Sequence, residues 1–124
     1  MNALTALENV YASGWSVTAT SAANTAGAAT KAAASGKTHY ITGFSVNVSD
    51  AAAGATAAGF AVQLKNGSTV IWTETLAASA AVGSCIAVEF PAPIPCTAGA
   101  AASINCAALG ASSKSNLNLN GYTI

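Results

Sequence analysis

Apolar and polar residues alternate along much of the chain, which is the pattern of β-strands with one buried face. The alternation begins at Trp15 and continues to Ala19. It is strongest over His39–Ser49, where β-branched and aromatic residues concentrate and Phe44 and Val46 share one face. Both segments are therefore predicted to be strands.

A β-hairpin is predicted from Phe60 to Leu76. Alternating residues before and after the dipeptide Asn66-Gly67 form two further strand patterns. Asn and Gly tolerate positive φ, which both central residues of a type I′ turn require, and the twist of that turn matches its flanking strands. The dipeptide is therefore expected to form the turn.

Three more strands are predicted in the second half of the chain. Ser84–Phe90 alternates and is followed by the proline-rich run 91–95. Because proline has no backbone N–H to donate, the strand is expected to end at this run. Residues 97–109 alternate again, and Leu117 and Leu119 lie in a last strand that runs almost to the C-terminus.

The N-terminal third is less patterned. Residues 21–37 are rich in Ala, Thr, Ser and Gly and carry no bulky apolar side chain, so a strand there would have to pack by close approach of the backbone. Residues 1–13 are expected to form an arm or short helix, since Leu4, Leu7 and Tyr11 share one helical stripe. This arm would contact the domain or a neighbouring subunit, and a frayed terminus is the alternative.

Seven or eight short strands without a long helix predict an all-β, antiparallel β-sandwich in a single domain over residues 14–124. The aromatic residues are spread about one per strand, which favours a core role over a sugar-stacking platform. The expected core residues are Trp15, Phe44, Val46, Phe60, Val62, Leu64, Trp72, Ile86, Val88, Phe90, Ile104, Leu117 and Leu119.

Composition excludes several functions. Charged residues make up 6% of the 124 residues, against roughly 25% in ordinary domains, and 32 residues are alanine. The four lysines are scattered and arginine is absent, so no basic stripe for nucleic acid is expected.

No run of about 20 apolar residues predicts a membrane span, and the N-terminus lacks the pattern of a secretory signal, so assembly in the cytoplasm is expected. A surface with so little charge would favour association.

Candidate catalytic groups are scarce, and we expect no enzyme. The chain has one histidine and four carboxylates, Glu8, Asp50, Glu74 and Glu89. His39, at the start of a strand, is expected to be a surface or interface residue rather than half of a Ser/His dyad. Glu74 is expected near solvent, with a lysine partner as the alternative. Asp50 lacks the acidic neighbours that a calcium site needs.

The cysteines Cys85, Cys96 and Cys106 form no CxxC pair and are odd in number. Neither a zinc site nor a disulfide framework is therefore predicted. All three are expected to be small buried residues in a reducing compartment. No metal or other cofactor is expected.

Four segments within residues 38–124 resemble small jelly-roll proteins of tailed bacteriophages. They are the strand start 39–44, the hairpin 62–72, the corner Phe90-Pro91-Ala92-Pro93-Ile94 and the terminal Leu119-Asn120-Gly121-Tyr122-Thr123. The resemblance implies a jelly-roll sandwich that serves as a head decoration or cement protein. Such a protein binds the outer surface of a phage capsid, links major capsid subunits and is commonly a homotrimer. The resemblance thus implies location in the virion.

A tail-fibre or receptor-binding tip is the alternative within the same fold. It would call for loops with aromatic or polar clusters that bind cell-surface glycans, whereas loops 50–59, 77–83 and 110–115 are almost entirely Ala, Gly, Ser and Asn. A small enzyme or lectin domain is a third interpretation, which the poor side-chain inventory disfavours. Beyond the arm, the Ala/Gly loop 51–59 is a candidate contact.

Overall fold

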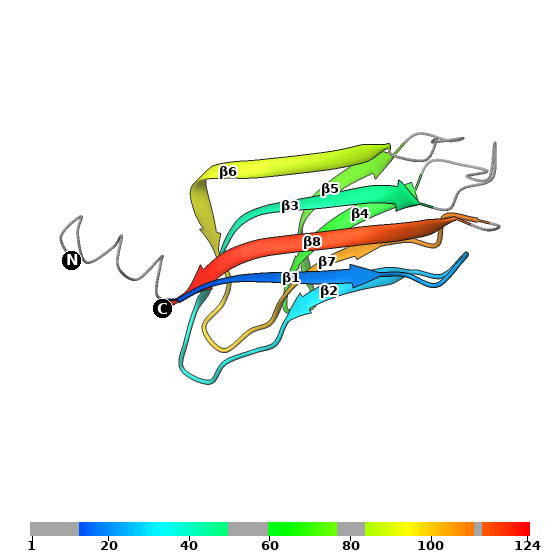
Figure 1. Cartoon of the computed structure of the whole chain (residues 1–124). Helices are drawn as coiled ribbons and strands as arrows, with labels where there is room; N and C mark the ends of the chain where they lie inside the picture. The colour runs from blue at the N-terminus through cyan, green and yellow to red at the C-terminus, as the bar shows by residue number, and fades with distance from the viewer. Residues whose placement is uncertain (1–12, 50–59, 77–83, 111–112) are drawn as a thin grey trace.

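The computed structural model describes residues 13–49, 60–76, 84–110 and 113–124. These residues form eight β-strands in two four-stranded sheets, and the predicted antiparallel β-sandwich is confirmed (Figure 1). The strands are β1 (Gly14–Thr20), β2 (Gly27–Lys31), β3 (His39–Ser49), β4 (Phe60–Asn66), β5 (Thr69–Leu76), β6 (Cys85–Pro95), β7 (Ala102–Cys106) and β8 (Lys114–Thr123).

The strand order is that of a jelly roll. One sheet has the order β1-β8-β3-β6 and the other β2-β7-β4-β5, and the neighbouring strands run antiparallel. The first strand pairs with the eighth, the second with the seventh, the third with the sixth and the fourth with the fifth. The chain thus behaves as one long hairpin that is rolled up, with the β4–β5 turn at its tip.

The core lies between the two sheets and is filled from alternate positions of the inner strands. The predicted core residues that are buried are Phe44, Val46, Val62, Leu64, Ile104, Leu117 and Leu119. Those that are partly buried and pack against this cluster are Trp15, Ile86, Val88 and Phe90. The buried members of this predicted set come from strands that have a neighbour on both sides and are therefore well covered.

The prediction that Trp72 is a core residue is wrong, since its side chain is 37% exposed. Trp72 pairs with the buried Leu64 and therefore faces the interior of the sandwich. However, β5 is the outer strand of its sheet, so no further strand covers the ring. The indole instead meets the ring of Phe90 edge-on, with 5.4 Å between the centroids.

The predicted end of a strand before the proline run is also wrong, since β6 continues to Pro95. β6 is the outer strand of its sheet and pairs only with β3, so its prolines interrupt no second ladder. The register shifts between Ile41 and Gly43 of β3, and Figure 1 shows β6 bending sharply along its length.

The predicted hairpin is confirmed, but its turn lies one residue later than expected. Asn66 pairs with Thr69, so Gly67 and Ser68 form the turn. Of these two only Gly67 has positive φ, at 59°, and the type I′ turn is therefore not formed. The Asn66 side chain instead accepts a hydrogen bond from the backbone N–H of Thr97 at 3.0 Å.

The Ala-rich tract contains the short strand β2, and it packs as expected from its small residues. A Cβ added at Gly27 would lie 2.8 Å from both Leu117 Cδ1 and Ser115 Oγ. The backbone of β2 at Gly27 therefore packs directly against side chains of the opposite sheet.

Several expectations fall outside the described residues. They concern the arm residues Leu4, Leu7 and Tyr11, the side chain of Phe60, and the loop 51–59. Within the described ranges, no helix has the length and hydrophobicity to cross a membrane.

Candidate interaction surfaces

Amides and hydroxyls line the outer face of the β1-β8-β3-β6 sheet, and they bond to each other across the strands. The Thr20 hydroxyl donates to Asn116 Oδ1 at 2.7 Å, and Asn116 Nδ2 donates to Asn47 Oδ1 at 2.9 Å. Asn118 Nδ2 donates to Ser45 Oγ at 3.1 Å. We call this surface, defined by these five residues, the amide face.

The amide face is ordered in advance of any contact. Its five residues carry no charge, and each is held by a neighbour on the next strand. A surface of this kind loses little side-chain entropy when a partner covers it, and it needs no partner of opposite charge. At one end of the same sheet the rings of Tyr40 and Tyr122 stack with 5.0 Å between centroids.

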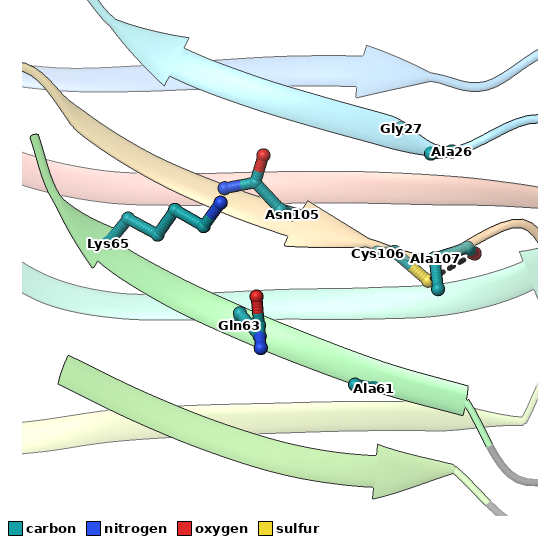
Figure 2. Close-up of a pocket in the computed structure, with 8 residues that line it drawn as sticks. All are labelled: Ala26, Gly27, Ala61, Gln63, Lys65, Asn105, Cys106 and Ala107. Carbon is teal, nitrogen blue, oxygen red and sulfur yellow. Dashed lines mark hydrogen bonds between the residues drawn. The ribbon is translucent and has the colours of Figure 1, made fainter. Parts of the chain in front are cut away.

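A hollow of about 370 Å³ lies on the outer face of the other sheet (Figure 2). It is lined by Ala26, Gly27, Ala61, Gln63, Lys65, Asn105, Cys106 and Ala107. Its polar groups are the ammonium group of Lys65 and the amides of Gln63 and Asn105, and Asn105 Nδ2 donates to Ser103 Oγ at 2.9 Å. This arrangement could hold a polar or anionic group by hydrogen bonds.

His39 is fully buried, so the prediction of a surface histidine is wrong. Its Nε2 lies 2.8 Å from the carbonyl oxygen of Ala32, and its Nδ1 lies 2.7 Å from Thr123 Oγ1. Since a carbonyl oxygen only accepts, Nε2 carries the proton and Nδ1 accepts from the Thr123 hydroxyl. Thr123 in turn accepts from Trp15 Nε1 at 2.9 Å.

This hydrogen-bonded chain joins three strands and the β2–β3 connection at one end of the sandwich. Trp15 belongs to β1, His39 to β3 and Thr123 to β8, whereas Ala32 follows β2. The histidine is buried because β3 lies between β8 and β6 and the Trp15 ring packs edge-on against it, with centroids 5.7 Å apart. Both ring nitrogens of His39 are thus engaged in hydrogen bonds within the fold.

Beside this network lies a second hollow of about 340 Å³, which contains two of the four lysines. It is lined by Ser13, Gly14, Trp15, Lys31, Ala34, Lys37, His39 and Thr123. The ammonium group of Lys31 lies 5.7 Å from the centroid of the Trp15 ring, which is within reach of a cation–π contact. We call this the lysine hollow.

Glu74 is half-buried and accepts a hydrogen bond from Trp72 Nε1 at 3.2 Å. It pairs with the buried Val62 across the strands and therefore faces the interior at the open edge of the sheet. An inward-pointing charge on an edge strand disfavours uncontrolled pairing of edges. Its partner is thus an indole rather than the lysine that the sequence left as an alternative.

Two of the three cysteines are buried as expected, and Cys85 is exposed. Cys85 is exposed because β6 is an edge strand and this residue points to the outer face, opposite Ile86. Burial raises the pKa of the Cys96 thiol. Burial also raises the pKa of Cys106 to about 11.

We expect only Cys85 to react with a disulfide reagent such as DTNB in the native protein. The thiolate is the reactive form, and burial disfavours it at Cys96 and Cys106. The absorbance should report one thiol per native chain and all three after unfolding. In a Cys85→Ser control the native signal should vanish, and equal native reaction rates for all three thiols would contradict this prediction.

The structure shows no metal-binding arrangement in the residues that it describes, since no group of three or more His, Cys, Asp or Glu lies together there.

No protein-family model matches the chain, and no curated protein matches it. Among solved structures the fold is similar to the PRD1 vertex protein P5, with a TM-score of 0.52 and 13% sequence identity over 89% of this chain and 96% of that one. A structure titled "Crystal Structure of FLHE" aligns with a TM-score of 0.39 and 14% identity, over 88% of this chain and 96% of that one. The likeness to P5 shows a shared fold over nearly the whole of that protein.

Proposed function

We propose that this chain is a structural protein of a phage virion and acts as a head decoration protein. It is a homotrimer that binds the outer surface of the capsid, links major capsid subunits and performs no catalysis. Its subunits assemble in the host cytoplasm. The observation that carries the proposal is the amide face, an uncharged surface whose polar groups are already ordered by cross-strand bonds. The resemblance of residues 38–124 to small phage jelly rolls and the fold shared with a PRD1 vertex protein support it.

A decoration protein gains its strength from repetition. Many copies bind equivalent sites on one shell, so modest individual contacts add up to stable attachment when subunits are joined in an oligomer. The amide face is suited to such contacts because it offers several donors and acceptors without a charge that must be neutralised. We place the capsid contact on this face.

The experiment is to add purified protein to heads from a phage that lacks its gene. We expect saturable binding and a higher temperature of DNA release. Asn118→Lys puts a charge into the amide face and should weaken binding at least tenfold, a loss of about 1.4 kcal/mol. Gln63→Lys adds the same charge on the outer face of the other sheet, on the inner strand β4, and should bind as the unmodified protein does. Failure of the unmodified protein to bind would refute the proposal.

The hollow shown in Figure 2 supports a second candidate function. Lys65, Gln63 and Asn105 place hydrogen-bonding groups in one depression, which would suit a glycan on a host cell. In that case the protein is a tail-fibre or receptor-binding tip, and Lys65→Ala should reduce attachment to host cells without changing the heads. Attachment to cells that is unaffected by this change would exclude the hollow as the receptor site.

A further inference from the structure

The two open edges of the sandwich carry charges of opposite sign, whereas the other described lysines, Lys65 and Lys114, lie on the inner strands β4 and β8. One edge is formed by β1 and β2, and the lysine hollow with Lys31 and Lys37 lies there. The opposite edge is formed by β5 and β6, which carry Glu74 and Glu89. We call them the lysine edge and the glutamate edge. Figure 1 shows β1 and β2 on one side of the molecule and β5 and β6 on the other.

We propose that the lysine edge of one copy binds the glutamate edge of a second copy, with the Glu89 carboxylate placed at the lysine hollow. This inference rests on the proposed function, which requires an oligomer, and it specifies which surfaces build that oligomer. The contact joins two different surfaces and is therefore heterologous, so it closes into a ring when the rotation between copies allows. The occupant of the lysine edge is thus another copy of this chain.

Glu89 and the Trp15 wall of the lysine hollow lie at about the same height along the strands. Glu89 of β6 pairs with Gly43, which pairs with Asn120, which pairs with Ser16 of β1. Glu89 therefore lies in the same cross-sheet row as Ser16, one residue from Trp15 in the wall of the lysine hollow. If neighbouring copies are related by a rotation axis that is parallel to the strands, equivalent rows of residues lie at the same height along that axis in every copy. In a closed ring of this kind, Glu89 faces the hollow of the neighbouring copy.

Glu89 is better placed than Glu74 to reach the lysine hollow of a second copy. It is exposed on the outer side of β6, whereas Glu74 is half-buried and already accepts a bond from Trp72. Lys37 is exposed on the β2–β3 connection, and Lys31 lies over the Trp15 ring. Glu89 and Lys37 are thus the pair that most readily meets across two copies.

The glutamate edge also exposes apolar surface that a second copy would cover. Val70 is 41% exposed and Trp72 is 37% exposed, and both belong to β5. A tryptophan at the centre of an interface commonly carries a large share of the binding energy. The indole is already oriented by its hydrogen bond to Glu74 and by its edge contact with Phe90, so its side chain loses little entropy on association.

Sedimentation velocity over a range of concentrations tests this contact. The unmodified protein should form a ring larger than a dimer that weakens at high salt. Lys37→Glu and Glu89→Lys each place like charges at the contact and should weaken association at least tenfold. The double variant K37E/E89K reverses the pair and should restore association. Lys65→Glu, on the outer face of the other sheet, is the matched control and should leave association unchanged.

Thermal melting of each variant separates loss of association from loss of folding. A protein that stays monomeric or stops at a dimer would overturn the inference, and so would an oligomer that both single reversals leave intact. If the ring forms as expected but gene-deleted heads fail to bind it, the decoration function fails and the edge-to-edge contact stands. If heads bind a protein that sediments as a monomer, attachment to heads stands, whereas the edge-to-edge contact and the proposed homotrimer both fail.

Discussion

Gly121→Ala is expected to destabilise the fold by about 3 kcal/mol or more, the upper range for forcing extra volume into a packed interior. A Cβ at this position would overlap the carbonyl oxygen of Tyr40 and come within 2.6 Å of the Trp15 ring. The first of these atoms is backbone and cannot turn away. Gly121 pairs with Ile41 of β3 on one side and with Trp15 of β1 on the other, so β8 is confined by a strand on each side.

The measurement is the melting temperature by circular dichroism, which should fall by more than about 10 °C. Gly99→Ala is the matched control, because a Cβ there meets nothing within 4 Å and its φ is +78°. The free energy of unfolding of Gly99→Ala should fall only by the strain of an alanine in the left-handed backbone conformation, about 1–2 kcal/mol. Equal losses in the two variants would contradict close approach at Gly121.

His39→Leu is expected to cost about 2–3 kcal/mol, because it takes the donor away from a carbonyl oxygen and removes a second hydrogen bond made by a fully buried ring. The carbonyl is that of Ala32, and the second bond is the one from the Thr123 hydroxyl. Leucine is similar to histidine in bulk, so the loss reports polar contacts rather than a cavity. The free energy of unfolding in urea is the measurement.

Two variants of the partner show whether the network acts as a unit. Thr123→Ser keeps the hydroxyl that links Trp15 to His39 and should be nearly neutral, whereas Thr123→Val removes it. Combining Thr123→Val with His39→Leu should cost less than the sum of the two, since both break the same bond. Strict additivity would contradict a shared network.

The alternation of apolar and polar residues was enough to predict β3, the β4–β5 hairpin and the sandwich itself, because burial of one face imposes a period of two. It could not give the position of a strand in its sheet. Trp72 was wrongly expected in the core because β5 is the outer strand of its sheet. The strand was wrongly expected to stop at its prolines because β6 is also an outer strand.

Contacts between distant parts of the chain were also beyond the sequence pattern. His39 is buried against Thr123, a partner 84 residues away that the strand pairing brings into place. The amide face depends on the same pairing, since Asn116 meets Asn47 only when β8 lies beside β3. The asparagines around Leu117 and Leu119 were visible in the sequence, but their neighbours were not.

The most direct test of the proposed function is the position of the protein in the particle. Gold-labelled antibody or an affinity tag on the C-terminal residue, which is exposed, would locate it in electron micrographs of purified virions. We predict label over the outer surface of the head, in many copies per particle. Label confined to the tail tip, or particles without the protein, would contradict a head decoration protein.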